Sequence, residues 1–132
     1  MKGMKIILFS YAIIYFLGFV LTILPWPMLT ESFVLSGVQP PVEDMLNMFW
    51  VRMSGVAFGL ATIFFVILAR NPLGYGAMLP FAAYGQICAG FSYLALGVLY
   101  EFPLTILIAA IEGCFLLGTG VLLLILLKKA MR

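Results

Sequence analysis

Two charged side chains stand inside stretches of sequence that are otherwise apolar. Glu112 lies in the middle of the run Leu104–Leu127, which is long enough to cross a lipid bilayer, and Arg52 lies within an earlier apolar run. An ionisable group at such a depth costs several kcal/mol, usually faces a partner or a cavity, and is a candidate for function. We therefore expect both side chains to face the interior of a helical membrane protein.

The chemistry of the two groups favours a pair. A carboxylate isolated from water tends to take up a proton, whereas a guanidinium keeps its proton at any accessible pH. We predict an Arg52–Glu112 ion pair, direct or bridged by water, with a hydroxyl of Tyr15 or Tyr93 attached. Losing one partner of a buried pair typically costs about 3–5 kcal/mol. The pair could fix helix register, form a ligand or ion site, or face a second subunit, and the sequence leaves these three readings open.

The chain carries few of the groups that catalysis or metal binding requires. It has no histidine, and its two cysteines, Cys88 and Cys114, fall inside apolar runs and form no CxxC pair. We interpret both as small apolar packing residues. No phosphate-binding glycine loop, metal cluster or nucleophile–base pair is visible. The sequence therefore predicts no enzymatic activity, no metal and no cofactor.

The composition is that of a polytopic membrane protein. Hydrophobic residues make up 65% of the chain and charged residues only 9%, against about 25% charged in a soluble domain. We predict an all-α fold, a four-transmembrane-helix bundle in a single domain over residues 1–132, with spans at 6–24, 47–69, 76–99 and 104–127. Pro25, Pro72 and Pro103 stand at the ends of these spans. The first run exceeds the apolar part of a signal peptide, so we expect a retained helix.

The charges predict an orientation. Threading four spans places six basic residues on one side of the membrane: Lys2, Lys5, Arg70, Lys128, Lys129 and Arg132. Four acidic residues fall on the other side: Glu31, Glu43, Asp44 and Glu101. Lys and Arg in short loops favour the cytoplasmic face, so we expect both termini to be cytoplasmic.

The longest connection, residues 25–46, falls on the outer side. Trp26 suits the headgroup region, and Met28–Gly37 mixes apolar and polar residues as a short interfacial helix would. The acidic stretch Val42–Asp44 is placed to cap the second span. A lid over the bundle and a plain connector are equally compatible with this loop.

Residues spaced three and four apart give each span one polar or small face. Beyond the four residues of the ion-pair site, we expect secondary polar contacts from Gln86, Tyr11, Thr105 and Thr119. The spacing Gly55-x-x-x-Gly59 allows close helix packing, and it lies on the face of Arg52, so we predict packing within the chain.

The stretch Phe49–Gly59, with an arginine followed by glycines, and the basic turn Ala69–Pro72 resemble small four-helix membrane proteins of bacteria, including DoxX-like proteins. The resemblance covers about a quarter of the chain. It implies a four-helix bundle in a bacterial inner membrane and no particular activity. Small multidrug transporters share the size and helix count, but their essential carboxylate lies in the first helix, and residues 6–24 contain none.

These features predict a non-enzymatic membrane protein. We expect it to bind an amphiphile, either a lipid or a quinone, between its helices, or to act as an accessory subunit of a larger membrane complex. The alternative is a small oligomeric proton-coupled transporter in which Glu112 titrates. The expected partners are membrane lipids and further membrane subunits, including copies of the same chain, and not nucleic acid.

Overall fold

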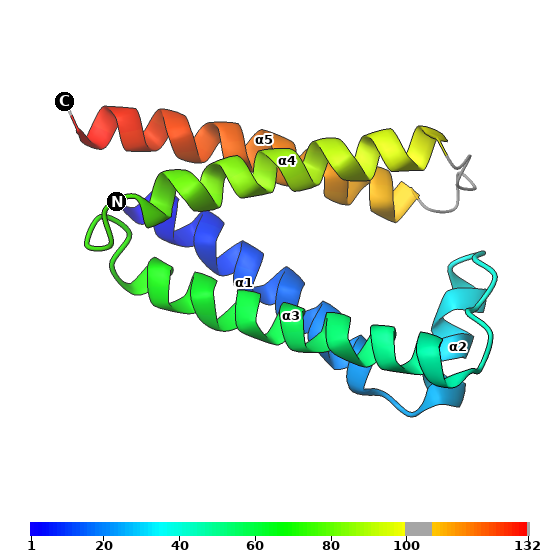
Figure 1. Cartoon of the computed structure of the whole chain (residues 1–132). Helices are drawn as coiled ribbons and strands as arrows, with labels where there is room; N and C mark the ends of the chain where they lie inside the picture. The colour runs from blue at the N-terminus through cyan, green and yellow to red at the C-terminus, as the bar shows by residue number, and fades with distance from the viewer. Residues whose placement is uncertain (100–106, 132) are drawn as a thin grey trace. The chain divides into compact units, whose positions relative to one another are not determined.

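The structure, a computed structural model, describes residues 1–99 and 107–131, with the backbone alone for residues 107–109. It contains five helices in the order α1 (Lys2–Ile23), α2 (Trp26–Leu35), α3 (Met45–Arg70), α4 (Met78–Leu99) and α5 (Leu107–Ala130) (Figure 1). No strand occurs in these two ranges, so the predicted all-α class is confirmed. The start of the last predicted span, at Leu104, lies outside the described residues.

Four helices are long and apolar enough to cross a membrane, namely α1, α3, α4 and the part of α5 over Ala110–Ala130. The prediction of four candidate spans is therefore confirmed by length and composition. The helices differ from the predicted spans at their starts, because α1 already begins at Lys2 and α4 begins only at Met78. The later start of α4 follows from Gly76, whose φ of 54° belongs to the turn and not to a helix.

Prolines and a glycine set the bounds of α2. Pro25 cannot donate a backbone hydrogen bond, so α1 ends at Ile23 and the chain turns into α2, which carries proline in its first turn. At the other end Gly37 adopts a φ of 72°. Its N–H donates to Val34 O at 2.9 Å and the next N–H, of Val38, donates to Phe33 O at 3.0 Å, which is a Schellman motif. The short helix expected in this loop is therefore present.

Asp44 caps the start of α3. Its Oδ1 accepts a hydrogen bond from the backbone N–H of Asn47 at 2.8 Å, and its Oδ2 accepts one from the Asn47 side chain at 2.8 Å. The same side chain also donates to Val42 O at 3.1 Å. These bonds satisfy a backbone donor at the helix start that would otherwise lack a partner. The predicted capping by the acidic stretch is confirmed for Asp44.

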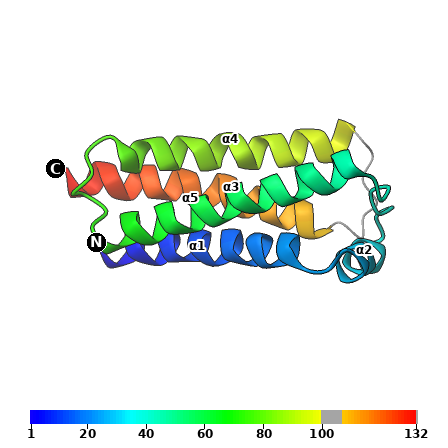
Figure 2. The ribbon, with the colours of Figure 1, turned by 60° about the horizontal axis from the view of Figure 1, so that its bottom comes forward.

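The chain divides into two compact units, one formed by Leu8–Ile67 and the other by Met1–Ile7 together with Leu68–Arg132. In the first unit α1 and α3 run antiparallel and side by side (Figure 2). A Cβ built on Gly18 would lie 3.1 Å from the Phe58 ring, and one built on Gly59 would lie 3.3 Å from the Phe19 ring. Each helix thus presents an aromatic ring to a glycine of the other, which brings the two backbones close together.

In the second unit α4 and α5 form an antiparallel hairpin. Its helices meet through small residues, since a Cβ on Gly90 would lie 2.6 Å from Gly113 O and one on Gly120 would lie 3.0 Å from Ala83 O. A real Cβ does not approach a backbone atom as closely as 2.6 Å, so glycine is required at position 90, and the contact at Gly120 is tight. We call this pair of helices the α4–α5 hairpin.

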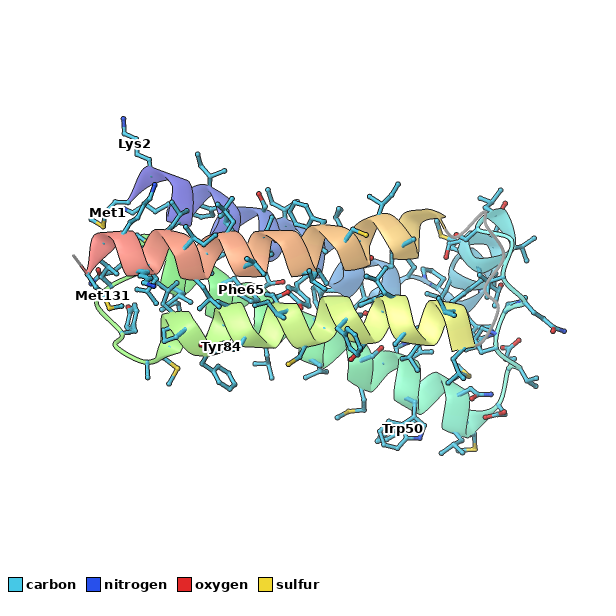
Figure 3. The ribbon with its side chains drawn as sticks, turned by 90° about the horizontal axis from the view of Figure 1, so that it is seen from above. Met1, Lys2, Trp50, Phe65, Tyr84 and Met131 are labelled. Atoms are coloured by element: carbon cyan, nitrogen blue, oxygen red, sulfur yellow. The ribbon has the colours of Figure 1, made fainter. Side chains whose placement is uncertain are left out.

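Some side chains lie elsewhere than expected. Cys88 and Cys114 are both exposed and are not packing residues, so that prediction is wrong. Other small residues of the same helices face the contact between α4 and α5, and the two cysteines lie on the helix faces away from this contact. Trp26 is only 7% exposed. By contrast, Trp50 and Tyr84 each point away from the helix that carries them, as Figure 3 shows, and are 62% and 59% exposed.

Candidate functional site

Arg52 forms hydrogen bonds with the C-terminal end of α1. Its Nη1 donates to the carbonyl oxygen of Thr22 and, at 2.9 Å, to that of Leu24. Both acceptors lie in the unit that contains Arg52. A cation at the C-terminal end of a helix also opposes the partial negative charge of the helix dipole. The guanidinium is therefore a cap for α1, in addition to any other role.

The local sequence explains why these carbonyl oxygens are available. The last carbonyl groups of a helix have no intrahelical donor, and here Pro25 and Pro27 remove two of the N–H groups that could have followed. In lipid, water cannot replace the missing donors, so an unsatisfied carbonyl costs several kcal/mol. One guanidinium, with its five N–H donors, can satisfy several such groups at once.

Gly55 allows Arg52 to reach this end of α1. The two residues lie three apart on α3, hence on one face, and Gly55 lies against Thr22. A Cβ on Gly55 would collide with Thr22 Oγ1 and come within 2.9 Å of Thr22 Cβ. The Thr22 hydroxyl itself donates to Phe19 O at 2.8 Å. Gly55 and Gly59, the glycines of the predicted packing motif, both lie against α1.

Tyr15 and Tyr11 lie in an aromatic cluster between α1 and α3. The Tyr15 ring stacks on Phe65 with a centroid distance of 5.4 Å and an interplanar angle of 8°, and Tyr11 meets Phe65 edge-on at 5.2 Å. Phe58 completes the cluster at 6.1 Å from Tyr15. Aromatic pairs of this kind contribute about 0.5–1.5 kcal/mol each beyond the area that they bury.

A polar stripe runs along one side of the α4–α5 hairpin. The line of contact between the helices passes through Ala83, Ile87, Gly90 and Leu94 on α4 and through Gly113, Leu117 and Gly120 on α5. On α4 each residue immediately before a contact residue belongs to one stripe: Ala82, Gln86, Ala89 and Tyr93. On α5 the same rule gives Glu112, Leu116 and Thr119. In a right-handed helix the residue before a contact residue points about 100° away from the contact direction. When two helices are antiparallel, this rotation leads to the same side of the pair. The two stripes therefore share one side of the hairpin.

The contacts also fix the levels of these residues. A Cβ on Gly113 would lie 3.1 Å from Tyr93 Cβ, so Glu112 lies at the level of Tyr93. A Cβ on Gly120 would lie 2.8 Å from Ile87, so Thr119 lies at the level of Gln86, about two helical turns further along.

The stripe varies in burial along its length. Gln86 is 5% exposed, Glu112 is half-buried and Tyr93 is 39% exposed. The Thr119 hydroxyl donates to Phe115 O within its own helix. The neighbouring Leu116 is an apolar core residue, 2% exposed. The hairpin thus carries a carboxyl, a phenol, an amide and a hydroxyl on one side, next to buried apolar surface.

The residues predicted for the site therefore fall into two groups. Glu112, Tyr93, Gln86 and Thr119 lie on one side of the α4–α5 hairpin, and Arg52, Tyr15, Tyr11, Gly55 and Gly59 lie at the contact of α1 with α3. Arg52 and Glu112 belong to different units, and their ion pair stays a prediction. Thr105 lies outside the described residues. Within the described ranges no three His, Cys, Asp or Glu side chains gather where they could hold a metal ion.

Reasoning from sequence missed the bonds between Arg52 and the end of α1. A signal for them exists, because two prolines directly after an apolar helix predict carbonyl groups without donors. An arginine in the next helix is then a candidate partner. The sequence predicts a carboxylate partner for Arg52, whereas the structure shows backbone carbonyl acceptors.

The comparison with known proteins adds no relative: no family model matches the chain, and neither a curated protein nor a solved structure resembles it significantly.

Proposed function

We propose that the chain is a small integral membrane protein that binds an amphiphile, a lipid or a quinone, on the polar side of its α4–α5 hairpin and catalyses no reaction. One observation carries this proposal: Glu112 lies beside the exposed Tyr93 on one side of the hairpin, and the same two helices expose large apolar side chains such as Phe91 and Ile111. An amphiphile needs both kinds of surface, because its polar head seeks hydrogen bonds and its tail seeks apolar contact.

The polar groups suit a head group that accepts and donates hydrogen bonds. The carboxyl of Glu112 can bond a hydroxyl of such a head group, and the phenol of Tyr93, which is 39% exposed, lies at the same level. Inside a bilayer an ionisable group is a candidate functional site, and α5 carries no second acid over Leu107–Ala130. The same surface could instead receive a helix of a larger complex, with the chain as an accessory subunit.

The location that we propose is a bacterial inner membrane, with both chain ends on the cytoplasmic side. The distribution of basic residues supports this orientation, since Lys2 and Lys5 lie in the first turn of α1, Arg70 ends α3, and Lys128 and Lys129 lie in the last turn of α5. The resemblance to DoxX-like proteins, which rests on Phe49–Gly59, points to the same membrane.

Native mass spectrometry of the protein released from its membrane tests the binding function. We expect a copurifying lipid or quinone in the wild type and its loss in Glu112→Gln, with helicity unchanged. Glu31→Gln is the matched control, because Glu31 is an exposed acid of α2 outside the hairpin. Identical bound species in the wild type and Glu112→Gln would contradict the proposal.

A proton-coupled transporter is the second candidate. It is favoured by one observation, that Glu112 is the single acidic residue in the four candidate spans. Such a transporter predicts that a pH gradient across liposomes dissipates when the wild type is reconstituted and persists with Glu112→Gln. A binding protein predicts no difference between the two preparations.

A further inference from the structure

Five basic side chains gather at one end of the unit formed by Met1–Ile7 and Leu68–Arg132. They come from three helices: Lys2 and Lys5 from the first turn of α1, Arg70 from the last turn of α3, and Lys128 and Lys129 from the last turn of α5. We call these residues the basic end. Lys5 is partly exposed and the other four are exposed.

A packing contact brings two of these segments together. A Cβ on Gly3 would lie 3.3 Å from Leu126 Cδ1, so the first turn of α1 lies against α5 just before Lys128. Figure 3 shows Met1 and Met131 at the same end of the unit, with Lys2 pointing outward. The two chain ends and the turn between α3 and α4 lie at the same end of this unit in Figures 1 and 2.

The basic end has no acid beside it in the part of the chain that the structure describes. The one acidic residue described in this unit is Glu112, which lies about 24 Å from Lys128 along α5 at 1.5 Å per residue. That separation exceeds the Debye length of about 8 Å at physiological salt. Among the residues that the structure describes in this unit, no acidic side chain therefore compensates the mutual repulsion of these charges.

The helix dipoles add to the excess of positive charge at the start of α1 and reduce it at the end of α5. Lys128 and Lys129 lie at the negative end of α5, where a cation is favourable. Lys2 and Lys5 lie at the positive end of α1, whose first turn contains no acidic residue. A cation there is unfavourable unless an anion is present, and free backbone N–H groups at a helix start bind phosphate readily.

We propose that the basic end binds the phosphate head groups of anionic phospholipids. Its residues end the apolar spans, so they lie at the depth of the head groups, which the long Lys and Arg side chains can reach from the helix ends. Anionic lipid attracts each such residue, and an arginine can hold a phosphate through two parallel hydrogen bonds. This surface is separate from the polar side of the hairpin, and its ligand is defined by the head group and not by the tail.

Native mass spectrometry in detergent, with phosphatidylglycerol or phosphatidylcholine added to the delipidated full chain, tests this inference. We expect phosphatidylglycerol to bind more tightly than phosphatidylcholine, and the double variant K128Q/K129Q to weaken its binding about thirty-fold. K128R/K129R should retain the affinity because it keeps both charges. E31Q/E43Q is the matched control, since it removes two exposed charges from residues outside this unit.

Three results would overturn the inference: equal affinity of the wild type for the two lipids, unchanged phosphatidylglycerol binding by K128Q/K129Q, or full displacement of the lipid by millimolar inorganic phosphate, which would identify a site for a soluble anion. The variant E112Q separates this surface from the proposed amphiphile site. It should leave phosphatidylglycerol binding unchanged even where it removes the copurifying molecule. Circular dichroism should report the same helicity for every variant, because all substituted basic residues are exposed.

Discussion

At the scale of single residues, Arg52 has a defined structural role. Its guanidinium satisfies carbonyl groups at the end of α1 that the following prolines leave without donors. A charge in an apolar helix is therefore explained in part by the backbone of a neighbouring helix. A functional role of Arg52 would therefore have to be shown by an effect on activity or binding beyond the loss of stability that follows from breaking these hydrogen bonds.

Replacement of Arg52 by glutamine or leucine should destabilise the protein. Hydrogen bonds to a charged group contribute about 1.5–3 kcal/mol, and the loss leaves carbonyl groups unsatisfied. We expect the free energy of unfolding in detergent to fall by about 2–3 kcal/mol for Arg52→Leu. Arg52→Lys should lose less, because an ammonium still donates to carbonyl oxygens, although without the planar fork. Equal stability of the wild type and Arg52→Leu would show that the bonds to α1 contribute nothing.

Gly55 provides a second test at the level of one atom. In Gly55→Ala the added Cβ would collide with Thr22 Oγ1, so α3 must move away from the end of α1. Overpacking of this kind costs about 1–3 kcal/mol. Thermal unfolding in detergent should show the loss, and Thr22→Ala introduced together with Gly55→Ala should recover part of it by removing the hydroxyl. An alanine at Gly55 that unfolds like the wild type would mean that the helices are not in close contact here.

At the scale of elements, the α4–α5 hairpin depends on where its glycines stand. Gly90→Ala would place a Cβ 2.6 Å from two backbone atoms of α5, which cannot move as a flexible side chain could. We expect a clear drop in the unfolding temperature. Gly85→Ala on the same helix is the matched control, because a Cβ there meets nothing within 4 Å. Its unfolding temperature should stay the same or rise slightly, since alanine favours a helix. Similar losses in both variants would argue against the close contact.

The elements were far easier to predict from the sequence than the contacts between them. Long apolar runs bounded by Pro25 and Pro72 define spans because their period and composition are local properties. Asp44 was recognisable as a cap for the same reason.

Helical spacing alone placed Gln86, Tyr93, Glu112 and Thr119 on stripes, and the hairpin contacts then put these stripes on one side. The acceptor of Arg52 is not local, because it depends on which carbonyl groups the fold leaves unsatisfied. Cys88 and Cys114 were misjudged because small apolar residues are equally compatible with an inner and an outer face.

At the scale of the whole molecule, the exposed surface of the described residues is compatible with an apolar solvent. Each candidate span exposes large apolar side chains. Examples are Ile13, Leu60, Phe91 and Ile111, which are 60%, 63%, 65% and 60% exposed. Monomeric soluble proteins rarely carry contiguous apolar surface of this extent. Four helices of this kind match a multi-pass membrane protein, in which lipid covers these faces.

An even number of spans places both chain ends on the same side, and this can be measured directly. Cys88 and Cys114 can be replaced by serine first, since both are exposed and fill no packing space. Single cysteines are then introduced at Lys2, Gln39 and Ala130, and spheroplasts are treated with a maleimide that does not cross membranes. We expect the Gln39→Cys protein to react from outside, whereas Lys2→Cys and Ala130→Cys should react only after the membrane is opened. The basic residues near the spans favour this orientation. If Gln39→Cys and Ala130→Cys react from the same side, the chain cannot cross the membrane an odd number of times between these two residues. The assignment of α3, α4 and α5 as three consecutive spans would then be wrong.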